Sequence, residues 1–132
     1  MSAVLGISCD YHDAAAALVV DGVLVAAVAE ERLSRLKHDS GLPRLAAAWC
    51  LRQGGLKGAD LDAVVFYEKP FVKFERILTS ALATVPRSLG AFTRAMPSWM
   101  GEKLWVGTRV RELVGPGPRL LYSEHHLSHA AS

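Results

Sequence analysis

The sequence predicts an α/β domain whose mixed sheet begins with a β-hairpin. Two apolar runs, 14–20 and 23–28, flank Asp21-Gly22, and an Asp-Gly pair between apolar runs is a strong hairpin signal because both central turn residues adopt positive φ. Further strand and helix patterns then alternate along the chain, as in α/β folds. With 132 residues and 51% hydrophobic content, the chain fits about one domain with a packed core.

Three adjacent strands are expected at the start of the chain. Residues 4–8 form a short apolar run typical of a buried strand, and the polar loop 9–13 leads from it into the hairpin. The next segment, 30–39, is densely charged and is interpreted as a solvated connection, because charge runs usually face water.

One helix and a fourth strand follow the charged segment. Pro43 suits the first turn of a helix, and Gly54-Gly55 suits its end. The apolar face expected for this helix consists of Leu45, Ala48, Trp49 and Leu51. Residues 63–67 are then predicted as a strand.

The last third of the chain is expected to be helical before it returns to the sheet. Residues 71–114 have a helical pattern with predicted breaks at Pro86 and Pro97, and Trp99 and Trp105 are expected in the core. After the stop at 115–118, a fifth strand is predicted at 119–122 and a final helix from about His125. The predicted order is β-β-β-α-β-(α)-β.

Charge and hydropathy exclude several classes of protein. The balance of 15 basic and 13 acidic residues gives a net charge of +2 without a basic stripe, which argues against a nucleic-acid binder. No apolar run reaches the roughly 18 residues of a membrane span, and the first residues lack the basic region of a secretory signal. Cys9 and Cys50 are too few for a disulfide framework. We therefore expect a soluble, cytoplasmic chain.

The pattern His125-His126-Leu127-Ser128-His129 is the sharpest chemical signal. His125 and His129 are four residues apart, so in a helix both imidazoles lie on one face, as two metal ligands require. Nitrogen ligands suit iron, zinc, nickel or copper, while surface or capping histidines are the alternative interpretation. His126 occupies the place of the glutamate in the zinc-protease pattern, which excludes that class.

The loop after the first strand carries a second signal, His12-Asp13. A turn at the end of a buried strand can present a titratable side chain to a ligand, and an imidazole changes charge near neutral pH. His12 is thus the best candidate for a general base, with an exposed loop histidine as the alternative. Lys37, in the charged segment, is a candidate for binding phosphate.

Several motifs, in order and spacing, resemble the amino terminus of the natural-product O-carbamoyltransferases, the family of nodulation-factor, cephamycin and aminoglycoside carbamoyl-transfer enzymes. Cys9-Asp10 departs from the family's pattern. The matching segments are Gly6-Ile7-Ser8, Tyr11-His12-Asp13 with the following alanines, Asp21-Gly22, Glu30-Glu31-Arg32, Lys37 to Pro43, Tyr67-Glu68-Lys69-Pro70 and His125 to Ser132.

The resemblance implies an actin/Hsp70-like ATPase (RNase H-like) fold, of which this chain would form half. It also implies a separate domain in which carbamoyl phosphate and ATP give carbamoyl adenylate. A hydroxyl of a small antibiotic or sugar-like acceptor would then attack the adenylate in the first domain.

Residue by residue, His125 and His129 match the family's iron-site histidines, which implies Fe²⁺ or another divalent cation. His12 and Lys37 match loop positions near the adenylate, where both are expected to serve catalysis and to bind the cofactor. The acidic metal ligands and the adenylate-forming domain would lie beyond this chain.

The order of elements predicts an N-terminal fragment or one half of a split domain, because the final helix begins barely two turns before Ser132. The resemblance then implies that residues 1–132 are the N-terminal part of a carbamoyl-transfer domain, inactive alone. One alternative is a tRNA threonylcarbamoyl-transfer protein, which shares the fold and the histidine pair; the charge balance and the motifs argue against it. The other is a non-catalytic metal-binding half-module.

Overall fold

The structure is a computed structural model that describes residues 1–101 and 103–131, and it confirms the α/β class. Ser132, the end of the last motif, lies outside the described residues. The elements are β1 (Ala3–Ser8), β2 (Ala15–Val20), β3 (Val23–Ala29), α1 (Glu30–Ser34), α2 (Arg44–Gly54), η1 (Gly58–Asp60), β4 (Ala63–Phe66), α3 (Pro70–Ala83), α4 (Leu89–Gly101), η2 (Lys103–Trp105), α5 (Val106–Val114), β5 (Arg119–Tyr122) and α6 (His125–Ala131).

The five strands form one mixed sheet in the order β3-β2-β1-β4-β5. The hairpin predicted from Asp21-Gly22 is present: β1 pairs antiparallel with β2, and β2 with β3. Both turn residues have positive φ, 49° at Asp21 and 80° at Gly22. β4 pairs parallel with β1 and with β5. Because these three strands are parallel, the loops that leave their carboxyl ends meet at the same edge of the sheet.

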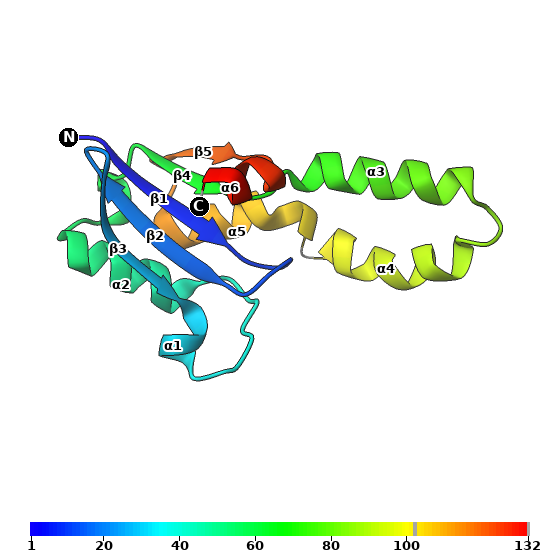
Figure 1. Cartoon of the computed structure of the whole chain (residues 1–132), viewed down its shortest axis with the longest axis horizontal. Coiled ribbons are helices and arrows are strands. Elements are labelled where there is room, and N and C mark those ends of the chain that lie inside the picture. The colour runs from blue at the N-terminus through cyan, green and yellow to red at the C-terminus, as the bar shows by residue number, and fades with distance from the viewer. Residues whose placement is uncertain (102, 132) are drawn as a thin grey trace.

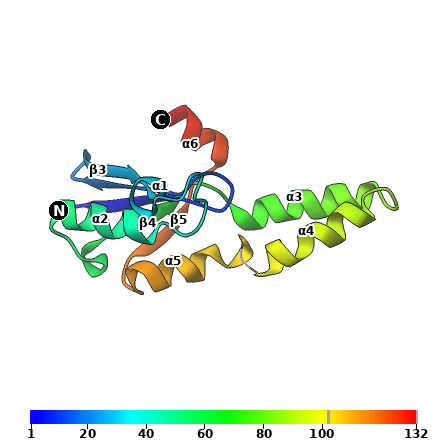
Figure 2. The same ribbon diagram turned by 90° about the horizontal axis from the view of Figure 1, so that it is seen from below.

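Helices cover the two faces of the sheet unequally. Figure 2 shows α2 and α5 on one face and α6 on the other. α2 packs on β2 and β3 through Ala46, Ala47 and Cys50, whose small side chains allow close approach. The apolar face predicted for this helix is confirmed for Trp49 and Leu51, which pack against the core, and is wrong for Leu45, which is 48% exposed, and for Ala48, which is also exposed. α5 adds Val106, Val110 and Val114 to the core.

Two long helices, α3 and α4, form a hairpin that projects from the sheet (Figure 1). The predicted break at Pro86 lies between them, whereas the break predicted at Pro97 is wrong because α4 continues through it. Burial of the residue two positions after the proline accompanies this continuation: Trp99 is 4% exposed and its ring contacts Tyr11 and Phe74. None of the helices in the described residues is long and apolar enough to cross a membrane.

Two further expectations are corrected by the structure. Trp105 is not a core residue, since it is 53% exposed and its indole Nε1 donates a hydrogen bond to the carbonyl of Met100. The charged segment is not simply a solvated connection, because it begins with α1 and its first residue, Glu30, is only 5% exposed. Its carboxylate accepts hydrogen bonds from the backbone N–H groups of Leu45 and Ala46, at the start of α2.

Candidate metal centre

The loops after β1, β4 and β5 bring three segments of the candidate site together. The first carries His12, the second begins at Tyr67, and the third leads into α6 with its two histidines. Ser123 N donates a hydrogen bond to the carbonyl of Phe66, which ties the third loop to the second. The parallel pairing of β1, β4 and β5 therefore places residues more than a hundred positions apart in the sequence at one point.

Three imidazoles converge at this point. His125 Nε2 lies 3.0 Å from His129 Nε2 and 3.4 Å from His12 Nε2. One ring nitrogen from each of the three lies within 4.8 Å of the others, which is a spacing that can hold a metal ion. The pair predicted from the i, i+4 spacing does face one way in α6, and His12 joins it from the β1 loop. His12 and His129 are exposed, and His125 is half-buried.

The surroundings of His125 favour its neutral form. Removal of the ring from water lowers its pKa below the ordinary value, the neighbouring His129, His12 and Lys73 lower it further, and Glu68 opposes them. A neutral imidazole is the form that binds a metal ion. The ring environment is thus compatible with a ligand at neutral pH.

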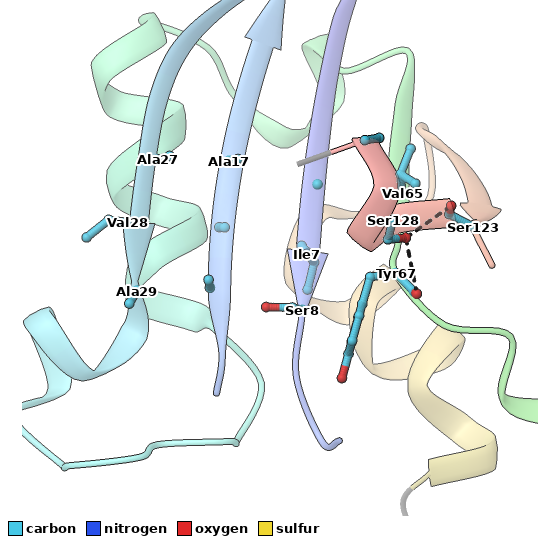
Figure 3. A pocket seen from close by; sticks show the side chains of 14 residues that line it. Ile7, Ser8, Ala17, Ala27, Val28, Ala29, Val65, Tyr67, Ser123 and Ser128 are labelled. Atoms are coloured by element: carbon cyan, nitrogen blue, oxygen red, sulfur yellow. Dashed lines mark hydrogen bonds between the residues drawn. The ribbon is translucent and has the colours of Figure 1, made fainter. Parts of the chain in front are cut away.

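Tyr67 and Ser128 fix the walls of the site (Figure 3). The Tyr67 hydroxyl donates a hydrogen bond of 3.2 Å to the carbonyl of Cys9, so the β4 loop holds the β1 loop in place. Burial raises the pKa of that hydroxyl above its usual range, so it remains a donor. Ser128 Oγ, on α6, lies within hydrogen-bond distance of the Tyr67 carbonyl and of Ser123 Oγ.

The loop that carries His12 is also held from the opposite side by a buried ion pair. Arg109 on α5 donates two hydrogen bonds to the carboxylate of Asp10, at 3.1 and 2.9 Å. Only 6% of the Asp10 side chain is exposed. Both bonds come from Nη1 of Arg109, and such charge-assisted hydrogen bonds are stronger than neutral ones, so this ion pair anchors the loop two residues before His12.

Lys37 does not lie within the imidazole cluster. It lines a separate surface groove with Glu31, Arg32 and Arg35. Its neighbour His38 connects this groove to the site, because His38 Nδ1 lies 3.2 Å from Asp13 Oδ2. The two loops also pair along the backbone, where Ala14 N donates to the carbonyl of Asp39. The loops that carry His12 and Lys37 are therefore in contact, although His12 belongs to the imidazole cluster and Lys37 lines the separate groove.

A broad apolar groove of about 650 Å³ lies beside the cluster on the sheet face that α6 partly covers (Figure 3). Small residues on β1 to β3 form its floor, and Tyr67, Ser123 and Ser128 form its wall on the side of α6. A flat, apolar floor next to polar side chains is the usual composition of a small-molecule site.

Comparison with known proteins decides the family. Residues 3–132 match the family described as carbamoyltransferase N-terminus, which is nearly the whole chain.

The chain therefore belongs to the carbamoyltransferase N-terminus family.

Two curated relatives support this assignment. The protein sll1178 of Synechocystis is 48% identical over 140 residues, which cover 100% of this chain and 23% of that protein. The nodulation protein NolNO of Sinorhizobium fredii is 35% identical over 125 residues, which cover 92% of this chain and 17% of that protein. The carbamoyltransferase N-terminus chain thus spans less than a quarter of the length of either relative.

The structure adds residues that the sequence did not single out. These residues contact the site through pairs between distant segments: Arg109 pairs with Asp10, and Glu68 lies beside His125. For Asp10 and Glu68 the only local signal is an acidic residue directly after a buried strand, a position that often serves a site. No local signal marks Arg109.

Proposed function

We propose that this chain forms the N-terminal part of a domain that transfers a carbamoyl group from carbamoyl adenylate to a hydroxyl of a small natural-product acceptor. The domain would have the actin/Hsp70-like fold, and another part of the same protein would make the adenylate from ATP and carbamoyl phosphate. Membership of the carbamoyltransferase N-terminus family and the resemblance to NolNO support the group that is transferred. The donor and the acceptor are those of the resembling O-carbamoyltransferases.

The observation that carries the proposal is the spacing of the three imidazoles. Two nitrogens bound at about 2.1 Å to one ion lie about 3.0 Å apart at a right angle and about 3.4 Å apart at a tetrahedral angle. The nitrogens of His129 and His125 are 3.0 Å apart, and those of His125 and His12 are 3.4 Å apart. The donor set fits Fe²⁺ or a similar divalent cation, with His125 and His129 as ligands and His12 in reach.

Different residues around that cluster would have different roles in the transfer reaction. A divalent cation bound there would neutralise charge on the phosphate of the departing AMP. His12 is exposed at the rim, where it can accept the proton of the attacking hydroxyl. Lys37, across the joined loops, would attract the anionic adenylate from its groove. The small residues of the apolar groove would hold flat, apolar parts of the substrates close to the cluster.

Carbamoylation by the full-length protein tests the proposal directly. The protein is supplied with ATP, carbamoyl phosphate and a panel of aminoglycoside and sugar-like acceptors, and the carbamoylated product is measured by mass spectrometry. Replacing both His125 and His129 by Ala should abolish bound metal and reduce transfer by about 10³-fold, as expected when charge stabilisation is lost.

His126→Ala is the matched control, because His126 lies on the same helix but outside the cluster. It should keep both the metal and the transfer rate. Metal content and transfer that survive the double substitution would refute the metal centre. Transfer of a threonylcarbamoyl group to tRNA, with no transfer to small acceptors, would refute the proposed acceptor class.

A further inference from the structure

Glu68 is a buried carboxylate to which the proposed function gives no task. It lies two residues after the end of β4, in the motif Tyr67-Glu68-Lys69-Pro70, and is 8% exposed. Acidic side chains are almost never buried unless they are paired. The buried carboxylate of Glu68 must therefore have charged or hydrogen-bonding partners beside the imidazole cluster.

The partners of Glu68 lie on both sides of its carboxylate. Its Oε2 is 3.1 Å from Nδ1 of His125 and 3.6 Å from Nζ of Lys73. Its Oε1 accepts a hydrogen bond from the backbone N–H of Lys69. The Nδ1 of His125 is itself buried and makes no hydrogen bond within the described residues. Oε2 of Glu68 lies at ion-pair distance from it, without the geometry of a hydrogen bond, so the negative carboxylate favours a proton on Nδ1 through its charge.

The two nitrogens of a neutral imidazole share one proton, so fixing it on Nδ1 leaves Nε2 with a free lone pair. Nε2 of His125 is the atom that faces both His12 and His129. A carboxylate behind a ligating histidine selects this tautomer, orients the ring and makes the ligating nitrogen more basic. Glu68 is such a carboxylate, since its Oε2 lies beside Nδ1, on the side of the His125 ring away from Nε2.

We propose that Glu68 is a positioning residue whose carboxylate, 3.1 Å from Nδ1 of His125, favours the proton on that nitrogen and so directs the lone pair of Nε2 into the imidazole cluster. The proposal rests on the metal site of the proposed function, but the tautomer can be measured without metal. A purely structural role is the alternative, in which Glu68 serves only to pair with Lys73.

The tautomer of His125 is the first measurement. Nitrogen NMR of the metal-free, uniformly labelled chain, at a pH where His125 is neutral, should show a protonated Nδ1 and an unprotonated Nε2. The measurement is made on the unsubstituted chain, so it does not depend on any variant folding. A proton found mainly on Nε2 would overturn the proposal. Glu68→Ala should shift the proton toward Nε2, whereas Lys73→Met, which removes the ion pair and the contact with the Tyr11 ring but keeps the Glu68 carboxylate, should leave it on Nδ1.

Metal affinity is the second measurement. Calorimetric titration with Co²⁺ should show binding that weakens by about 10-fold in Glu68→Gln and by up to about 100-fold in Glu68→Ala, the range known for such outer partners of metal ligands. Glu124→Gln is the charge control, because Glu124 is an exposed carboxylate paired with Lys69, and it should bind like the unsubstituted chain. Equal affinity in all four proteins would overturn the proposal for Glu68. Full-length protein that binds no Co²⁺ in the same titration would refute the metal site of the proposed function, and the tautomer would still decide the role of Glu68.

Discussion

The three imidazoles of the cluster come from two segments, which separates their roles. His125 and His129 share a helix, while His12 stands on a loop that Asp10 and Tyr67 hold from two sides. A group that accepts a proton from an incoming substrate must be reachable, and His12 is exposed at the rim of the cluster. Its placement suits proton transfer better than structural support.

We predict that His12→Ala separates the two half-reactions in the full-length protein. Formation of carbamoyl adenylate should stay near normal, because it takes place in another part of the protein, while transfer should fall by roughly 10²–10⁴-fold, the range for a lost general base. One assay follows ATP-dependent adenylate formation and a second follows carbamoylated product. If transfer fell together with bound metal, His12 would be a ligand rather than the base; unchanged transfer would make it a mere loop residue.

A second residue-scale prediction concerns the thiol of Cys9. Burial, with a smaller contribution from the charge of Asp10, raises the pKa of Cys9 to about 12. At pH 8 roughly one molecule in 10⁴ then carries the reactive thiolate. Iodoacetamide at pH 8 should leave the native chain unlabelled for hours and label it fully in urea, as intact mass will show. Rapid native labelling of Cys9 would contradict the burial described for it.

The spacing of residues in the sequence predicts part of this site but not the rest. The pair His125 and His129 is visible in the sequence because helical periodicity is local. That His12 joins the pair follows only from the parallel pairing of β1, β4 and β5. The buried partners, Glu68 and Asp10, were not predicted because a carboxylate is buried only where a distant basic group or N–H meets it.

At the scale of elements, Glu30 links three parts of the fold. It follows the last residue of β3, begins α1, and accepts backbone hydrogen bonds from the first turn of α2. The first N–H groups of a helix have no partner within the helix, and a negative charge there also meets the positive end of its dipole. A carboxylate from another element thus takes the place of the local cap that α2 lacks.

Glu30→Ala should therefore lower the free energy of unfolding by about 2–3 kcal/mol, since it leaves two buried N–H groups unpaired. Glu112→Gln, an exposed change on α5, should alter it by less than about 0.5 kcal/mol. Urea unfolding followed by circular dichroism measures both. Equal stability of the two variants would show that water replaces the carboxylate at no cost.

Elements were predictable where their signals are local. The hairpin follows from Asp21-Gly22, and the end of α2 follows from Gly54-Gly55, where Gly55 has the positive φ of a helix cap. The continuation of α4 through Pro97 was not, because a proline in a helix costs energy that only the burial of Trp99 against Tyr11 and Phe74 offsets. That burial joins segments far apart in the sequence.

At the scale of the whole molecule, the β3 edge of the sheet is unprotected. β3 is an edge strand whose first three residues, Val23, Leu24 and Val25, are 64%, 62% and 42% exposed. An edge offers unpaired N–H and C=O groups to another strand, and proteins usually guard it with charge, proline or a covering element. This stretch of β3 has no charged residue or proline, and Figure 1 shows it at the margin of the sheet.

We predict that the 132-residue chain associates through this edge in solution. Light scattering after size-exclusion chromatography, over a hundredfold range of concentration, should show a mass that rises above the monomer. Leu24→Lys should hold the chain monomeric at every concentration, because a lysine on an edge strand opposes strand addition. Leu36→Lys is the matched control, since Leu36 is 64% exposed but lies in a loop, and it should associate like the unsubstituted chain. Dissociation by Leu36→Lys to the same extent would assign the association to general surface hydrophobicity. An unsubstituted chain that is monomeric at all concentrations would show that the turn at Asp21-Gly22 and the twist of β3 protect the edge.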